Sequence, residues 1–359
     1  MRNKNIIRLC LIGIFTVIFN LQAQEVIKTS ALKSNNYGVT YILPKTTLII
    51  DVEYSKTTFK AGTYARYAER YLGITSNVIH EDLVEYNLDK VEVSSKGIPD
   101  KSESYLVEFK AKTSAPFVYL TKDGLICTIN AEYTPEAVVA KKEIQNTPVT
   151  DPSIAAQSSF TEEYLRAGSV SKMAEVAAKQ IYKLRESRMD ILTGEAENAP
   201  KDGEAMKIVM QQLEAQEKAL VELFIGSQST ERFIATFEAD PTGNMEKDVL
   251  FRFSKYLGVV DSDDLSGSPV YINLKKIETI EEPPVDPKAK KEVKGIVYNI
   301  PGKASVEVFF GTKQMFKSDV EIAQFGSKRI LGISIFEDKK GPVKVYFYPE
   351  TGGIKQIIQ

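Results

Sequence analysis

Two long stretches with helical periodicity, set between regions that alternate like strands, most constrain the fold of this chain. From Ser169 to Thr193 apolar residues recur every three or four positions, and Gly194 ends the run. A second stretch starts near Asp202, which is a good N-cap, and stops at Gly226. The short connection between them allows the chain to reverse direction. The pattern therefore predicts an antiparallel helical hairpin with helices about 36 Å long.

Strand patterns lie on both sides of this hairpin. Before it, Leu48, Ile50, Val52 and Tyr54 alternate on one face. An Asp123-Gly124 turn between two apolar runs predicts a β-hairpin. A short helix, roughly Tyr64 to Leu72 and closed by Gly73, interrupts these strands. From Phe233 onward strand patterns return.

The sequence thus predicts an α+β fold with two β-rich, sandwich-like domains and an inserted antiparallel helical hairpin. The expected organisation is a signal peptide over 1–23, an N-terminal β-rich domain over 24–143, a polar linker over 144–158, the helical hairpin over 159–228 and a C-terminal β-rich domain over 229–359.

The start of the chain predicts export. Basic residues Arg2, Lys4 and Arg8 lead into a short apolar run that ends before Ala23, as in a cleaved secretory signal. The run is too short to span a bilayer. Arg8 precedes Cys10 and most of the apolar run follows it, which argues against lipid attachment, so we do not expect a lipoprotein.

Composition excludes several classes of function. Without residues 1–23 the chain has a formal charge of −5, mild and well mixed, and it offers no basic stripe to nucleic acid. Cys127 is then the single cysteine, so no intramolecular disulfide can form, and its apolar strand pattern predicts an inert core residue. With His80 as the single histidine, zinc sites and histidine-dependent nucleophiles are disfavoured. We expect no cofactor.

Ser169 and Lys172 match the Ser-x-x-Lys pattern of serine acyl-transferases acting on peptidoglycan-like substrates. At a helix start this spacing brings the amine to the hydroxyl that it would deprotonate. The companion Lys-Thr-Gly pattern is missing from the sequence. We favour the alternative, in which Ser169 caps the helix and Lys172 is a surface residue.

Two further groups are candidates for binding. Acidic residues Glu195, Glu197, Asp202 and Glu204 at the hairpin tip are candidates for calcium, although no calcium-loop pattern is present and capping explains the last two. The tyrosines Tyr64, Tyr67 and Tyr71 share one helical stripe and are candidates for a sugar platform, with half-buried packing as the favoured interpretation.

Eight segments carry a family resemblance: 41–46, 64–73, 97–100, 192–195, 200–205, 222–226, 300–304 and 324–326. With them the chain resembles the exported bacterial proteins of domain-of-unknown-function family 4831 over nearly all of its length after residue 23. The resemblance implies a gram-negative envelope location, in the periplasm or at the outer membrane, and one family unit of about this length. It implies no activity and singles out no catalytic residue.

The sequence therefore favours a non-catalytic structural or protein-interaction component of the cell envelope, with an envelope or outer-membrane protein as its partner. The alternative is a binding module for a peptide, glycan or lipid in a cleft between the β-rich domains. An enzyme of the serine/lysine type comes third.

Overall fold

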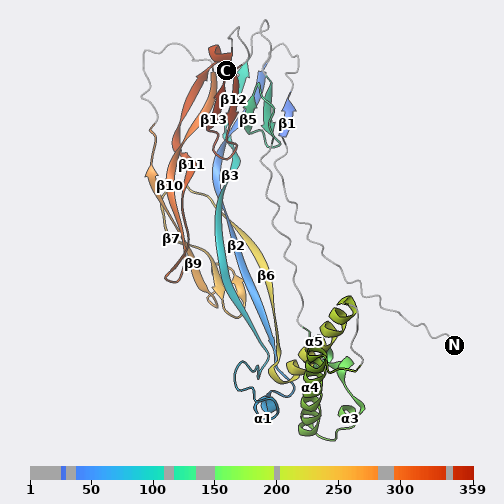
Figure 1. Ribbon diagram of the computed structural model, residues 1–359. Coiled ribbons are helices and arrows are strands. Elements are labelled where there is room, and N and C mark those ends of the chain that lie inside the picture. Colours follow the sequence, from blue (N-terminus) through green and yellow to red (C-terminus); the bar gives the residue numbers. More distant parts are fainter. Residues whose placement is uncertain are drawn as a thin grey trace, which may run out of the picture.

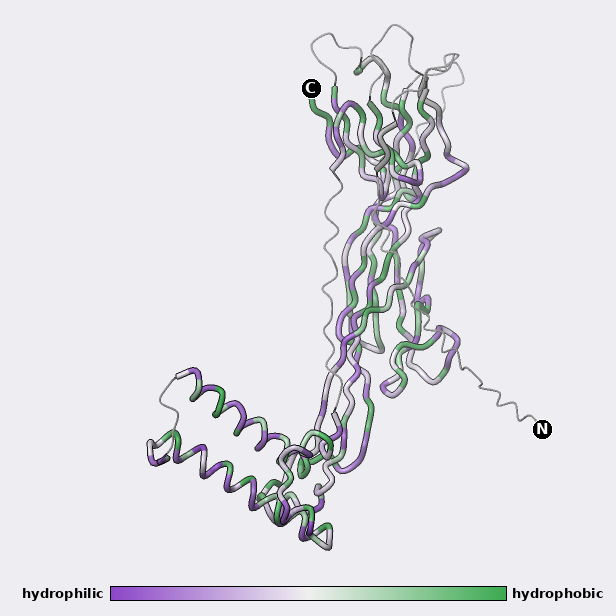
Figure 2. Tube along the Cα trace, turned by 90° about the vertical axis from the view of Figure 1, so that its right-hand side faces the viewer, coloured by the Kyte–Doolittle hydropathy of each residue, from purple (hydrophilic) through white to green (hydrophobic). Residues whose placement is uncertain are grey.

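The computed structural model describes residues 26–29, 38–108, 117–134, 150–197, 203–281, 295–336 and 343–359. A long β-sheet body ends in a helical region, from which two helices project (Figures 1 and 2). The strands are β1 Val26–Thr29, β2 Gly38–Lys60, β3 Leu83–Glu108, β4 Val118–Thr121, β5 Ile126–Ile129, β6 Ser227–Ala239, β7 Met245–Ser254, β8 Gly258–Val260, β9 Ser268–Glu278, β10 Gly295–Phe310, β11 Lys313–Gly332, β12 Lys344–Phe347 and β13 Ile354–Ile358.

The helical elements are the 3₁₀ turns η1 Ala65–Tyr67, η2 Gln157–Ser159 and η3 Ile333–Phe336, and the α-helices α1 Ala68–Leu72, α2 Pro152–Ala155, α3 Glu162–Leu165, α4 Val170–Thr193 and α5 Gly203–Ile225. The β-rich α+β fold is confirmed, and α4 and α5 form the expected hairpin (Figure 1).

Within the described residues the strands form three antiparallel sheets. Their strand orders are β1-β4-β5-β12-β13, β11-β10-β9-β7-β8 and β3-β2-β6. In the third sheet β2 pairs with β3 on one side and with β6, from beyond the hairpin, on the other. Strands of the two expected β-rich domains thus share a sheet, and the domain boundaries themselves stay a prediction.

Part of the predicted linker is helical. The side chain of Asp151 accepts a hydrogen bond from the backbone N–H of Ser153 (2.9 Å) and caps α2. Ala156, which follows α2, is fully buried in the helical region. The chain from Asp151 onward is therefore packed structure, while residues 144–149 lie outside the described ranges.

Strand β2 passes through two hydrophobic cores. Its 23 residues span about 75 Å at the rise of a β-strand. Tyr41 and Leu43 lie in an upper core with β4, β5, β10 and β12. Leu48, Ile50 and Val52 lie in a middle core with β3, β7, β9, β10 and β11. The buried positions change from odd to even numbers along the strand, which a regular strand cannot do without an irregularity.

The irregularity lies between the two cores, in a region that we call the waist: residues 44–47, 97–100, 299–302, 323–326 and 349–353. The pairing of β2 with β3 shifts between Ile42 and Pro44. The pairing of β10 with β11 shifts at Pro301, opposite which β11 carries the bulged residues 323–326. Such bulges bend a strand and turn its side chains. Four of the eight family-like segments meet here.

At the waist, side chains form hydrogen bonds with backbone groups that a neighbouring strand would otherwise pair. The Gln324 carboxamide accepts from the backbone N–H of Thr46 (2.8 Å) and donates to the C=O of the same residue (2.8 Å). The Thr46 hydroxyl donates to the C=O of Glu350 (3.0 Å). Just above, the Tyr41 hydroxyl accepts from Val297 N–H (2.7 Å) and donates to Val297 C=O (2.8 Å). Buried backbone groups of β2 and β10 are thereby satisfied across the sheets.

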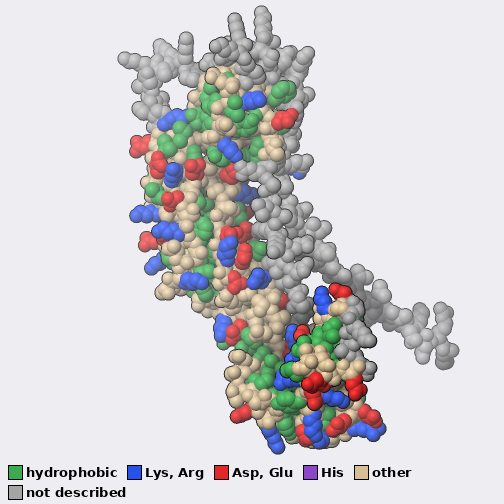
Figure 3. All heavy atoms as spheres, in the orientation of Figure 1, with side chains coloured by type: hydrophobic (Ala, Val, Ile, Leu, Met, Phe, Trp, Pro, Cys, Tyr) green, Lys and Arg blue, Asp and Glu red, His purple; other side chains and the backbone are tan. Residues whose placement is uncertain are grey.

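The body carries many charged side chains on its surface. On the face shown in Figure 3, acidic and basic side chains are interspersed over the sheets. Many of them pair across neighbouring strands, for example Lys317 with Glu307 (2.7 Å) and Lys56 with Glu231 (3.3 Å). Exposed pairs of this kind add little stability, so we expect packing at the cores and the waist to dominate.

We predict that Gly326→Ala destabilises the protein by about 3 kcal/mol, as an overpacked core does. A Cβ at this position would lie 1.8 Å from the backbone oxygen of Ile300, and backbone on both sides cannot move aside cheaply. Chemical denaturation followed by circular dichroism measures the change. Gly168→Ala is the matched control, since nothing lies within 4 Å of its added Cβ, and a similar loss there would contradict the prediction.

Candidate functional site

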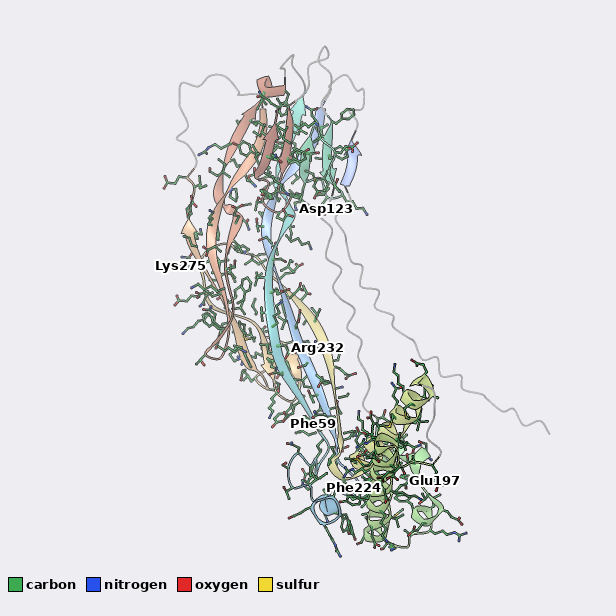
Figure 4. All side chains as sticks on the ribbon, viewed as in Figure 1. Phe59, Asp123, Glu197, Phe224, Arg232 and Lys275 are labelled. Carbon is green, nitrogen blue, oxygen red and sulfur yellow. The ribbon has the colours of Figure 1, made fainter. Side chains whose placement is uncertain are left out.

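The helical region has its own buried core, which holds only the near half of the hairpin. It consists of Tyr64, Ala68, Ala156, Tyr164, Ala174, Val176, Ala177, Ala178, Ile181, Leu220, Leu223 and Phe224. Figure 4 shows Phe224 within the packed side chains of this region. The core lies between the start of α4 and the end of α5, with α1, α2, η2 and α3 around them.

Backbone hydrogen bonds connect this core to the segment between strands β2 and β3 of the body. The N–H of Tyr64 donates to the C=O of Leu223 (2.6 Å), and the N–H of Ile79 donates to the C=O of Ile225 (2.9 Å). Gly226 then turns the chain from α5 into β6 with a φ of 84°, a conformation that favours glycine. The base of the hairpin is therefore continuous with strands β2 and β6.

The expected helix ends are confirmed. Ser169 caps α4, its hydroxyl accepting from the backbone N–H of Lys172 (3.2 Å). Gly194 ends α4 in the left-handed conformation (φ 78°), and Gly73 ends α1 in the same way (φ 69°). Asp202 lies outside the described residues, so its predicted cap on α5 stays a prediction.

Ser169 and Lys172 are both engaged in structural roles. Besides the cap, the Lys172 amine forms an ion pair with Glu175 (3.0 Å) one turn along the helix. The geometry is that of a capped, charged helix start, which agrees with the interpretation favoured from the sequence. An acyl-transfer role for this pair stays a hypothesis without a supporting contact.

The acidic candidates lie around the hairpin tip. Glu195 and Glu197 follow α4, and Glu204 lies in the first turn of α5, where the helix dipole favours an acidic residue. In the part of the chain that the structure describes, no three His, Cys, Asp or Glu side chains lie close enough together to hold a metal ion. Asp202 belongs to the undescribed connection, and calcium binding there stays a prediction.

The three tyrosines pack against the hairpin. Tyr64 is 2% exposed, and its hydroxyl shares a hydrogen bond with that of Tyr164. Burial raises the pKa of Tyr64 above its ordinary value. Tyr67 stacks near Tyr71 (5.9 Å between ring centroids), and the Tyr71 hydroxyl lies 3.2 Å from that of Ser171 on α4. Tyr67 and Tyr71 are partly buried, as favoured from the sequence, whereas Tyr64 is fully buried.

His80 and Cys127 differ in exposure. His80 is exposed on the loop before β3. Cys127 is fully buried in β5, and burial raises the pKa of its thiol to about 12, so the thiolate is scarce at neutral pH.

The far half of the hairpin lies outside the buried core of the helical region. We call residues 182–193 of α4 and 203–216 of α5 the distal hairpin; none of them is fully buried. The two helices hold each other through Arg185 and Arg188 of α4, which both pair with Glu217 of α5 (2.7 and 2.8 Å). Two helices alone cannot enclose an apolar seam, so this half presents apolar surface to its surroundings.

One stripe of α4 is the most exposed apolar feature of the distal hairpin. Tyr182, Met189 and Leu192 are 49%, 59% and 66% exposed. Tyr182 and Met189 lie two turns apart on one face, and Leu192 follows one turn later. Leu192 is one of the apolar residues that recur at helical spacing, yet its side chain lies outside the buried core. The sequence feature that corresponds to this exposed stripe is the seven-residue spacing from Tyr182 to Met189.

None of the helices in the described ranges combines the length and the apolar character that a membrane crossing requires.

We predict that Ser169→Ala lowers the free energy of unfolding by about 1 kcal/mol, because it removes the cap of α4. Ser169→Asp should retain the stability, since Asp caps helices as well as Ser does. Denaturation curves of the three proteins check this. Covalent labelling of Ser169 by a fluorophosphonate or a β-lactam would contradict a purely structural role.

Comparisons with known proteins place the chain in a family. The model of a domain of unknown function, DUF4831, matches residues 37–355. No curated protein and no solved structure matches the chain. The match extends from the start of β2 into β13, so it includes the waist, the helical region and both cores. The chain belongs to the DUF4831 family.

Proposed function

We propose that this protein is an exported, non-catalytic component of a gram-negative cell envelope that acts by binding another envelope protein through its distal hairpin. The observation that carries the proposal is the exposed apolar stripe of Tyr182, Met189 and Leu192 in a half of the hairpin where no described residue is fully buried. An exposed apolar patch of this kind favours protein interaction.

The position of the distal hairpin supports the proposal. The hairpin projects from the end of the body, away from the sheets (Figure 2). Its base is hydrogen-bonded to Tyr64 and Ile79 in the segment between β2 and β3 and runs directly into β6, so the body holds the base of the helices in place. This arrangement suits a protein that presents the distal hairpin to a partner at a distance from the β-sheet body.

Export is supported by the basic start, the apolar run and Ala23 in the first 23 residues. We place the protein in the periplasm or at the outer membrane. The engaged side chains of Ser169 and Lys172 favour a binding role over a hydrolytic one.

We predict that Met189→Glu/Leu192→Glu abolishes capture of the partner while the fold is retained. The tagged protein is purified from its own detergent-solubilised envelope, and co-purified proteins are quantified by mass spectrometry. Both side chains are exposed, so a charge there should change stability by no more than about 0.5 kcal/mol.

The matched control is Ile154→Glu/Leu165→Glu, which alters two equally exposed apolar residues (65% and 67%) on α2 and α3. This control should capture the same partner as the wild type. A partner that binds the Met189→Glu/Leu192→Glu protein as strongly as the wild type would overturn the role of the distal hairpin.

A further inference from the structure

We propose that the envelope partner binds the distal hairpin with a basic amphipathic helix, which lies along the seam between α4 and α5. The inference rests on the proposed function and adds the chemical class of the partner segment. The partner helix would complete a three-helix bundle in which the apolar faces of all three helices are covered.

An ion pair between the two helices defines which side chains face the seam. Arg185 of α4 reaches Glu217 of α5 (2.7 Å), so each of these two side chains points toward the other helix. Residues that follow or precede them in steps of three and four lie on the same helix faces. From this pair to the tip, the seam is therefore lined by Met189 and Leu192 of α4 and by Met206, Met210 and Leu213 of α5.

The seam is open in the distal hairpin. Met189 and Leu192 are 59% and 66% exposed, although they share a helix face with Arg185, which contacts α5. The three α5 residues of the seam are partly exposed as well. A third helix that packs along both helices would cover these side chains. From Arg185 to Gly194 the seam is about 14 Å long, which accommodates between two and three turns of such a helix.

Methionine is the commonest residue of the seam. Three of the seven methionines in the chain are here: Met189, Met206 and Met210. The methionine side chain is unbranched and polarizable, so it adapts its shape to the surface that it contacts. Methionine-rich surfaces of this kind are typical of proteins that receive amphipathic helices of varied sequence.

The charges beside the seam favour a basic partner helix. Glu186 lies three residues before Met189, and Glu214 lies four residues after Met210, so both exposed carboxylates lie next to the seam, one on each helix. Within the described ranges, neither carboxylate forms an ion pair. Lys207, three residues before Met210, is a basic residue on the same side of α5.

The distal hairpin as a whole has more acidic than basic residues. Residues 182–197 and 203–216 contain six acidic and four basic side chains. Two of the basic ones, Arg185 and Arg188, are already paired with Glu217. A helix with lysine or arginine on both sides of its apolar stripe would bring a cation to Glu186 and another to Glu214, whereas an acidic helix would meet like charges there.

Three synthetic peptides of about 18 residues test the proposal by fluorescence anisotropy with the chain from Gln24 onward. The basic peptide has leucines at helical spacing and lysines elsewhere, and the acidic peptide has glutamates in place of the lysines. The scrambled peptide has the composition of the basic one without helical spacing. We expect the basic peptide to bind with a dissociation constant in the micromolar range, and the other two to bind at least about 10-fold more weakly.

Variants of the chain locate the binding. Glu186→Lys/Glu214→Lys should bind the basic peptide about 10-fold more weakly and the acidic peptide more tightly than the wild type does, because both charge contacts are reversed. Met189→Ala/Leu192→Ala should also weaken binding of the basic peptide about 10-fold, since it removes apolar contact area. Circular dichroism establishes that the variants are folded.

The matched control is Glu246→Lys/Asp263→Lys, which makes the same change in net charge at two exposed residues of the β-sheet body. This control should bind the basic peptide like the wild type. A wild-type chain that binds none of the peptides at about 1 mM, or that binds the acidic or the scrambled peptide as tightly as the basic one, would overturn the proposal. Equal binding of the basic peptide by Glu186→Lys/Glu214→Lys and the wild type would also overturn it.

The result is separable from the proposed function. If the peptides show no preference for the basic helix, but capture of an envelope protein is still lost in Met189→Glu/Leu192→Glu, the basic helix is refuted and the proposed function stands. The expected peptide preference without any captured envelope protein would support the seam as a site for basic helices and refute the envelope partner.

Discussion

The clamp between Gln324 and Thr46 is the interaction on which the rest of the structure depends. It joins β11 to β2 at the point where the buried face of β2 changes, where residues 323–326 of β11 are out of register with β10 and where β2 is paired with β3 but not yet with β6. Thr46 is fully buried, so leaving its backbone groups unpaired would cost about 1–3 kcal/mol for each. With the clamp, one strand can serve two cores and the body is a single long unit.

The helical region depends on this continuity. Strands β2, β3 and β6 leave the middle core and carry the hairpin at their far end (Figure 1). The hairpin base is bonded to Tyr64 and Ile79 in the segment between β2 and β3, while Arg185 and Arg188 of the distal hairpin pair with Glu217. The base of the hairpin is fixed to the β-sheet body and the distal hairpin is exposed. This arrangement suits the presentation of a small apolar surface.

Local features were predictable from the sequence, and long-range ones were not. The ends of α4 follow from Ser169 and Gly194, because capping depends on neighbouring residues. The waist joins residues far apart in the chain, such as Tyr41 with Val297, and no local pattern reports such a pair. The segments that resemble the family include Pro44 and Gln324 and so lie at the waist, but the resemblance does not predict the hydrogen bonds formed there. The periodicity of α4 does not show which of its apolar residues are buried, so the exposure of Leu192 could not be predicted from it.

Native-state hydrogen exchange along β2 tests most directly whether the two cores form one unit. If the two cores form one unit, amides near Tyr41 and Leu43 in the upper core, and near Ile50 and Val52 in the middle core, exchange through one shared opening. Their opening free energies should then agree within about 1 kcal/mol and fall together with denaturant. Two groups of amides with clearly different free energies would contradict it, because the waist would then separate two independently unfolding domains.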